Sequence, residues 1–225
     1  METKKLTTEQ IGYVSNYIQS FDIKWYELQV ELTDHFVSIM EEIWNEDPEL
    51  SFHQVKYRAE QRFGRNYFKQ VVKERKKILQ KEYNSKQRKM IAAYLSFPKI
   101  IGSVLLMIVI YNISFYFENT SKFISSLFLI LFLFLPPFIY QYIKNRNIEG
   151  KRFLAIEYSL GYLGLFIFPQ LGMNLSNLYK EEIQHNHLLV FLFICLWVLG
   201  FLFCITGIHL NNKIVANIKK QYKLI

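Results

Sequence analysis

The sequence predicts an all-α protein: an N-terminal soluble bundle of three to four helices, followed by a four-helix transmembrane domain. In the first 95 residues, apolar side chains recur at spacings of three and four, the period of amphipathic helices. Beyond them lie four long apolar runs, each near the length that a helix needs to cross about 30 Å of hydrocarbon. We therefore expect a cytoplasmic helical domain at residues 1–95 and a membrane domain at residues 96–225.

The predicted soluble part has an acidic first half and a basic second half. Residues 1–50 carry eleven acidic and three basic residues, a net charge of −8, and residues 51–99 carry fourteen basic and three acidic residues, a net charge of +11. The whole chain has a net charge of +8. A basic chain can indicate nucleic-acid binding. Because most basic residues lie beside the apolar runs, we expect the lipid bilayer as a partner and no nucleic acid.

The first helices are marked by their starting signals. Thr7 can cap a helix, and Gln10 can return the second bond of a capping box. The same pattern recurs at Ser51 and Gln54. Between these signals we expect one long helix, whose apolar stripe is Trp25, Leu28, Leu32, Phe36, Ile39 and Ile43.

Two more helices complete the predicted soluble part. The third runs from Ser51 to Phe63, with Gly64 as the residue after its C-cap. The fourth begins near Asn66 and continues toward the membrane, where Pro98 marks a break.

An acidic face on the long helix is our candidate surface for a protein partner, and its residues are Glu31, Asp34, His35 and Glu42. Glu31 and His35 lie four residues apart and could share a metal ion, but such sites need ligands from other helices too. We favour a surface pair over a metal site. An enzyme acting on lipid through Glu31, Asp34 and His35 is a third, less favoured reading, and we expect no catalytic, cofactor or metal site.

A resemblance supports the regulatory reading. The segments Tyr26–Leu28, Glu31–Phe36, Glu41–Glu42, Ser51–Phe52 and Arg62–Gly64 resemble the HAAS-type signalling domains and the related permease prefix domains of bacterial membrane proteins. The resemblance covers about residues 7–80 and departs from the pattern at residues 47–50, where the usual glycine is absent. It implies a small cytoplasmic helical module with a role in signalling, or in assembly with a transport complex, rather than catalysis.

The basic residues before the first apolar run are candidates for contact with anionic lipid. They are Lys73, Arg75, Lys76, Lys77, Lys81, Lys86, Arg88 and Lys89. A solvated helix face is the alternative reading. The acidic first 50 residues could also contact this segment, within one chain or between copies in a homo-oligomer.

The four predicted spans cover residues 100–117, 123–143, 153–173 and 187–210. The loop Lys144–Arg152 and the C-terminal tail each carry four basic residues, whereas the loop at residues 174–186 has one lysine and two glutamates. Because short loops rich in Lys and Arg stay in the cytoplasm, we expect a multi-pass protein of the bacterial inner membrane with both termini cytoplasmic.

Polar residues in the spans are the candidates for function inside the membrane. Asn112 could bridge helices, and Glu157 and His209 could pair or anchor their helices at the interface. Pro136 and Pro137 should kink the second span. No chain of acidic residues crosses the spans, so we expect a non-enzymatic regulatory or signalling protein whose N-terminal domain binds a cytoplasmic protein. The alternative is an accessory subunit of a transporter, or a small transporter.

Overall fold

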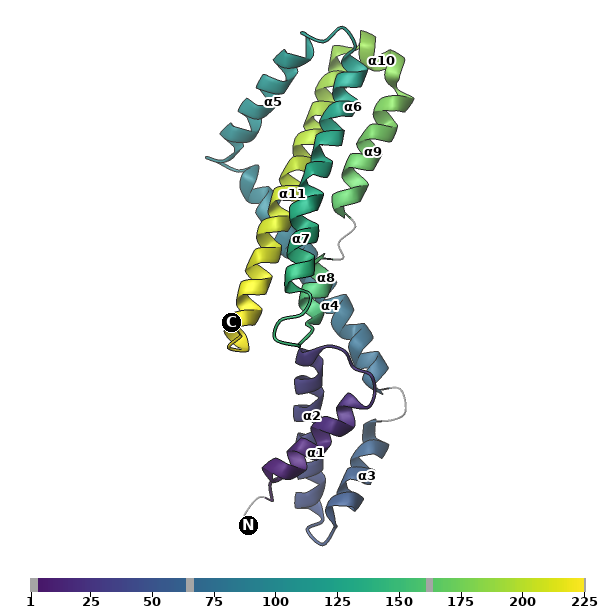
Figure 1. Cartoon of the computed structure of the whole chain (residues 1–225), viewed down its shortest axis with the longest axis vertical. Coiled ribbons are helices and arrows are strands. Elements are labelled where there is room, and N and C mark those ends of the chain that lie inside the picture. The colour runs from purple at the N-terminus through teal and green to yellow at the C-terminus, as the bar shows by residue number, and fades with distance from the viewer. Residues whose placement is uncertain (1–3, 64–66, 161–163, 225) are drawn as a thin grey trace. The chain divides into compact units, whose positions relative to one another are not determined.

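The computed structural model describes residues 4–63, 67–160 and 164–224, without the side chains of residues 159, 160 and 164–166, and this part of the chain is all-α (Figure 1). Within these ranges the only extended pairing is an isolated bridge between Ile148 and Lys151. The sequence prediction of an all-α fold is confirmed.

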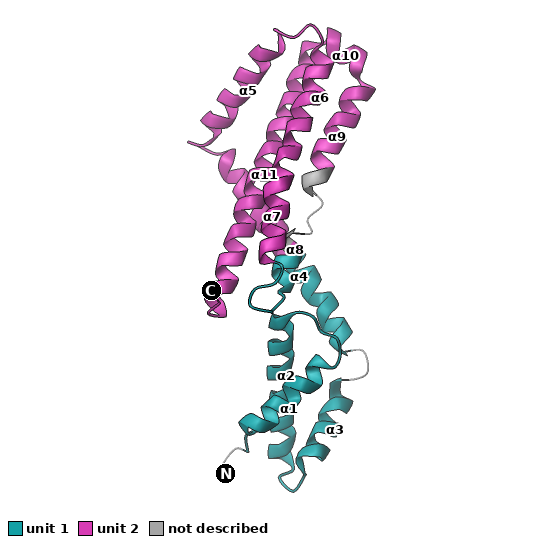
Figure 2. Cartoon of the chain, viewed as in Figure 1, with its two compact units in different colours: residues 1–80, 146–157 teal, residues 81–145, 158–225 magenta. Residues whose placement is uncertain are grey.

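The chain forms two compact units (Figure 2). The first contains residues 1–80 together with residues 146–157, and the second contains residues 81–145 and 158–225. The sequence analysis placed the boundary at residue 95 and left residues 146–152 as a loop between two spans. The structure instead groups that loop, and the start of the apolar run after it, with the N-terminal helices.

The first unit begins with α1 (Thr8–Gln19), α2 (Tyr26–Glu46) and α3 (Phe52–Phe63). The predicted capping box is present: the Thr7 N–H donates to Gln10 Oε1 over 2.9 Å, and the Gln10 N–H donates to Thr7 Oγ1 over 3.3 Å. Ser51 and Gln54 make the same reciprocal bonds before α3, over 2.9 and 3.4 Å. Both predicted helix starts are therefore confirmed.

The core of the first unit is built on the apolar stripe of α2. Leu28, Phe36 and Met40 are completely buried, and Leu32 nearly so. Residues of α1, α3 and the start of α4 (Tyr67–Tyr94) pack around them. Burying each such side chain stabilises the fold by about 1.5–3 kcal/mol. Leu154, far away in the sequence, belongs to the same core and is 2 % exposed.

The second unit contains α5 (Ile100–Ser114), α6 (Thr120–Ile130), α7 (Leu135–Asn145), α9 (Gly164–Leu178), α10 (Lys180–His185) and α11 (His187–Gln221). In Figure 1, α6, α9 and α11 run alongside one another, and each of the three helices contacts the other two. Small side chains line one of these interfaces, because Ser125 Oγ lies 2.7 Å from Ser176 Oγ. Ser121 also donates to the Ser176 carbonyl over 3.2 Å.

Two of the described helices are long and apolar enough to cross a membrane. They are the continuous helical segment Thr120–Asn145 and the helix α11. At about 1.5 Å per residue, α5 covers only about 22 Å with its 15 residues. In the third predicted span the structure describes α8 (Leu154–Leu160) and α9, and residues 161–163 lie outside the described part. Among the described residues, two of the four expected spans thus correspond to long apolar helices, and the first corresponds to the shorter helix α5.

The proline pair in the second predicted span changes the helix type locally. A short 3₁₀ turn, Leu131–Phe134, separates α6 from α7 just before Pro136 and Pro137. Neither proline has an N–H to donate to the preceding turn, so the α-helical bonds cannot continue through it. The break that the sequence predicted at Pro98 also occurs, since α4 ends at Tyr94 and α5 begins at Ile100.

Candidate functional site

The most elaborate polar arrangement in the first unit joins the N-terminal turn of α2 to the segment Lys151–Glu157. We call this arrangement the loop-docking site. It consists of Trp25, Tyr26 and Glu27 at the start of α2, Arg75 and Lys76 of α4, and Lys151, Arg152, Phe153, Leu154 and Glu157.

Glu157 is the centre of this site. The Trp25 indole N–H donates to Glu157 Oε2 over 2.9 Å, and Arg152 Nε donates to Glu157 Oε1 over 2.7 Å. A terminal guanidinium nitrogen of Arg152 contacts the same oxygen, so the ion pair is held by two nitrogens. The Glu157 side chain is only 18 % exposed. A charge-assisted pair that is partly shielded from water is stronger than an ordinary surface pair.

Glu27 holds the beginning of α8. Its Oε1 accepts the N–H of Ala155 over 3.1 Å, and amide groups at a helix start otherwise lack partners within the helix. Burial raises the pKa of the Glu27 carboxyl, although the amides of Ala155 and Leu154 and the charge of Arg75 act in the opposite direction. Its other oxygen, Oε2, is buried and makes no hydrogen bond within the described part of the chain.

Backbone and aromatic contacts surround these two carboxylates. The Tyr26 N–H donates to the Arg152 carbonyl over 2.8 Å. Lys151 Nζ lies 4.3 Å from the centre of the Tyr26 ring, and Phe153 meets the same ring edge-on at 5.9 Å. On α4, Lys76 Nζ lies 4.8 Å from the centre of the Trp25 ring. The segment is thus held by backbone, charged and apolar contacts together.

Two shallow hollows lie next to the site. One, of about 410 Å³, is lined by Trp25, Phe21, Ile23, Phe68 and Val72 with Asp22 and Lys69. The other, of about 380 Å³, shares Phe21 and Phe68 with it. Both are mainly apolar.

The predicted partner surface lies elsewhere on α2. Glu31, Asp34, His35 and Glu42 are all exposed and share one face of the helix. His35 Nδ1 lies 2.9 Å from the Tyr67 hydroxyl, and its ring packs edge-on against Phe63. Within the residues that the structure describes, no three His, Cys, Asp or Glu side chains are grouped so that they could hold a metal ion. His35 therefore helps to join α2 to the next two helices.

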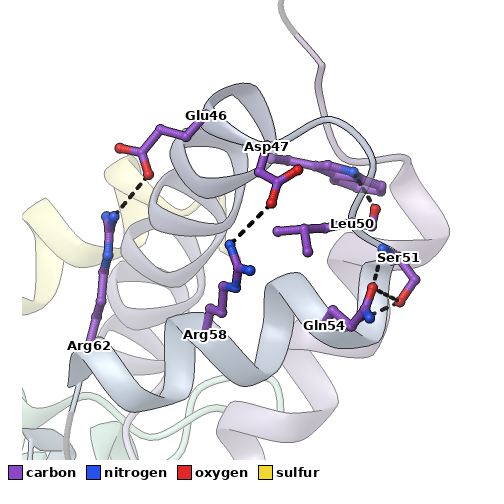
Figure 3. A network of polar contacts seen from close by, with 8 residues as sticks. Glu46, Asp47, Leu50, Ser51, Gln54, Arg58 and Arg62 are labelled. Atoms are coloured by element: carbon purple, nitrogen blue, oxygen red, sulfur yellow. Dashed lines mark hydrogen bonds and ion pairs between the residues drawn. The ribbon is translucent and has the colours of Figure 1, made fainter.

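The end of this face takes part in an ion-pair network around the turn from α2 to α3 (Figure 3). Arg62 pairs with Glu46 over 3.2 Å and with Glu42 over 3.5 Å. Arg58 pairs with Asp47 over 3.4 Å. All of these charges are well exposed, so each pair contributes only about 0–1 kcal/mol. Glu31 and Asp34 lie outside this network, nearer the loop-docking site along the helix.

The eight basic residues predicted to contact lipid all lie on α4 and separate into two groups. Arg75 and Lys76 are half-buried at the loop-docking site, not on an exposed lipid-facing stripe. The remaining six, Lys73, Lys77, Lys81, Lys86, Arg88 and Lys89, are exposed. The first two of these belong to the first unit and the last four to the second.

The three residues that we predicted inside the membrane are divided between the two units. Glu157 belongs to the first unit, whereas Asn112 and His209 belong to the second. Asn112 donates to the Ile108 carbonyl of its own helix over 2.8 Å, and His209 is exposed on α11. The carboxylate of Glu157 binds Trp25 and Arg152 because the apolar run around it continues the core of the first unit.

The sequence analysis missed Glu27 and the role of Trp25. One local signal was present: no side chain at residue 25 can accept a capping bond at the start of α2, so Trp25 serves another purpose there. The second half of the site was hidden, because Phe153 and Leu154 begin an apolar run that reads as a membrane span.

Comparisons with protein-family models, with curated proteins and with solved structures gave no match. The resemblance to HAAS-type and permease prefix domains therefore remains a prediction from the residues alone.

Proposed function

We propose that this chain is a membrane-anchored regulatory protein without a catalytic role. In this proposal the N-terminal helices bind a cytoplasmic protein partner, and the apolar helices anchor the chain in the bacterial inner membrane with both termini in the cytoplasm. The observation that carries the proposal is the loop-docking site, because it ties the N-terminal domain to a segment that continues directly into apolar helices at both ends.

The order of the helices along the chain supports a role in transmitting movements of the apolar helices to the N-terminal domain. The docked segment follows α7 and leads through α8 toward α9, so displacement of these helices would act on the bonds to Trp25, Tyr26 and Glu27. Regulation of this kind requires an element with two arrangements that both sites influence. The two arrangements in our proposal are the docked and the released segment.

The same helix carries the proposed partner surface. Trp25 and Glu27 hold the segment at the beginning of α2, and Glu31 and Asp34 are exposed one to two turns further along. Because an α-helix is stiff over this distance, a movement of its first turn on release of the segment would also move these two carboxylates. The resemblance to signalling domains gives independent support for a protein partner.

The experiment compares two matched pairs of substitutions in the full-length protein. Glu31→Gln with Asp34→Asn removes two charges from the proposed surface, and Glu9→Gln with Glu49→Gln removes two exposed charges elsewhere in the same unit. After cross-linking in native membranes, mass spectrometry should find a partner that wild type and the control retain and the surface variant loses. Retention of the same partners by both variants, or none by wild type, would contradict the proposal.

The accessory transporter subunit remains the alternative. Its main support was a set of polar groups inside the spans, and Glu157 no longer belongs to that set because it binds Trp25 and Arg152. Unchanged substrate uptake in a strain whose chain carries Asn112→Leu would count further against this alternative.

A further inference from the structure

A group of cations lies on the part of α4 that belongs to the second unit. Lys86, Arg88 and Lys89 are exposed there. On the opposite side of the same turns, Tyr83 is 5 % and Gln87 is 2 % exposed. Gln87 Nε2 donates to the Phe203 carbonyl of α11 over 3.2 Å. Because Gln87 lies between these cations in the sequence, its bond to Phe203 places all three beside this part of α11.

The position along α11 determines the depth of these cations. At about 1.5 Å per residue, Phe203 lies about 24 Å and Gly207 about 30 Å from the start of the helix at His187. A Cβ atom on Gly207 would lie 3.4 Å from Gln87 Nε2, so the two helices are close at this level. A hydrocarbon core is about 30 Å thick. If α11 spans the membrane from His187, as the proposed function has it, Lys86, Arg88 and Lys89 lie level with about the last 6 Å of the core, from which long charged side chains extend to the headgroups.

The charges at the two ends of α11 indicate that the three cations lie on the cytoplasmic side of the membrane, where basic residues are enriched. Beyond this level α11 continues with the exposed Lys213 and Lys220. At the other end of the helix, the preceding α10 carries Glu181 and Glu182. Lys86 lies 3.3 Å from Glu82, but both side chains are more than half exposed. Exposed pairs of this kind hold their charges weakly, so Lys86 stays available to a stronger anion.

We propose that Lys86, Arg88 and Lys89 form a binding surface for the anionic phospholipid headgroups of the inner leaflet. The two ammonium groups supply point charges, and the guanidinium can bind two phosphate oxygens at once. This surface is distinct from the loop-docking site and from the acidic face of α2. Of the eight basic residues singled out in the sequence, these three belong to the second unit and lie within two positions of Gln87.

The test uses the full-length protein in detergent with equal amounts of phosphatidylglycerol and phosphatidylcholine, and native mass spectrometry counts the lipids retained. The variant carries Lys86→Gln, Arg88→Gln and Lys89→Gln. The matched control removes the same charge from exposed positions of α4 in the first unit, through Lys69→Gln, Lys73→Gln and Lys77→Gln. We expect the preference of wild type for phosphatidylglycerol to fall by roughly tenfold or more in the variant, since each cation adds to the attraction, and to persist in the control.

Three results would overturn this proposal: an unchanged preference in the variant, an equal loss in both triple variants, or displacement of phosphatidylglycerol by an oligoribonucleotide. Lys86→Arg with Lys89→Arg keeps the charge and should keep the preference, which covers the case in which the glutamine variant misfolds. A failure here leaves the partner experiment on Glu31 and Asp34 untouched, because those variants retain all three cations.

Discussion

The Trp25 indole N–H donates to Glu157 Oε2 over 2.9 Å, although the two residues are 132 positions apart in the sequence. The carboxylate also pairs with Arg152, five residues before it. This bond connects the first turn of α2 to a segment that leads into apolar helices. Together with the backbone, aromatic and core contacts of residues 151–155, it holds the N-terminal helices and residues 146–157 in one compact unit.

Replacing Trp25 by Phe should loosen this segment. The ring is kept but the donor is lost, and a hydrogen bond to a charged group contributes about 1.5–3 kcal/mol. We expect trypsin to cleave after Lys151 and Arg152 roughly tenfold faster or more, since about 1.4 kcal/mol corresponds to a factor of ten. Trp44→Phe is the control, because it removes a similar indole bond, to the Leu50 carbonyl, at the other end of α2. Equal cleavage of wild type and Trp25→Phe would show that the bond does not hold the segment.

Glu27 should make docking depend on pH. Its pKa is raised by burial in the docked state, so this state binds a proton more tightly than the released state does. Docking is then strongest near and below the ordinary carboxyl pKa, and weakens as the pH rises through the raised value. Thermal unfolding of wild type and Glu27→Gln should therefore differ with pH, wild type gaining relative to the variant from pH 8 to pH 5. The exposed Glu31→Gln serves as control, and a constant difference across this range would be evidence against a titrating Glu27.

Leu154→Ala should destabilise the first unit. Leu154 is 2 % exposed and lies in the core with residues of α2. Truncation of a buried leucine costs about 2–5 kcal/mol, and the melting temperature of the first unit should fall accordingly. Leu133→Ala removes the same atoms from a side chain that is 69 % exposed, and should have little effect. If both variants melt like wild type, Leu154 does not belong to this core.

Gly172→Ala should disturb the second unit. A Cβ atom at this position would overlap the ring of Phe128, so the close contact between α6 and α9 requires glycine. Overpacking of this kind costs about 1–3 kcal/mol. Addition of Phe128→Leu should restore part of the loss. Gly102→Ala is the control, because nothing lies within 4 Å of its Cβ position. Thermal unfolding in detergent measures all three variants.

The helices of the first unit could be predicted from the sequence because their signals are local. Thr7 with Gln10 and Ser51 with Gln54 mark two helix starts, and the stripe from Leu28 to Ile43 fixes the buried face of α2. The proline pair likewise predicted a kink or break in the second span, and a 3₁₀ turn precedes it at Leu131–Phe134. Each of these features depends on residues within a few positions of one another.

The loop-docking site could not be predicted in the same way. Phe153, Leu154 and Ile156 are buried, and an apolar run looks the same whether it enters lipid or the core of a soluble domain. The burial of Glu27 depends on a segment more than 120 residues away, since its carboxylate accepts the Ala155 N–H. Arg75 and Lys76 looked like the other basic residues of their helix, and only the position of Trp25 and Glu27 sets them apart.

A double-mutant cycle on Trp25→Phe and Glu157→Gln tests the docking of residues 146–157 most directly. The full-length protein in lipid vesicles is treated with trypsin, and the rate of cleavage after Lys151 and Arg152 is measured for wild type, both single variants and the double variant. If the two side chains act through one bond, the double variant is cleaved no faster than the faster single variant, with a coupling energy of about 0.5–3 kcal/mol. Rates that simply multiply, with no coupling energy, would contradict the account.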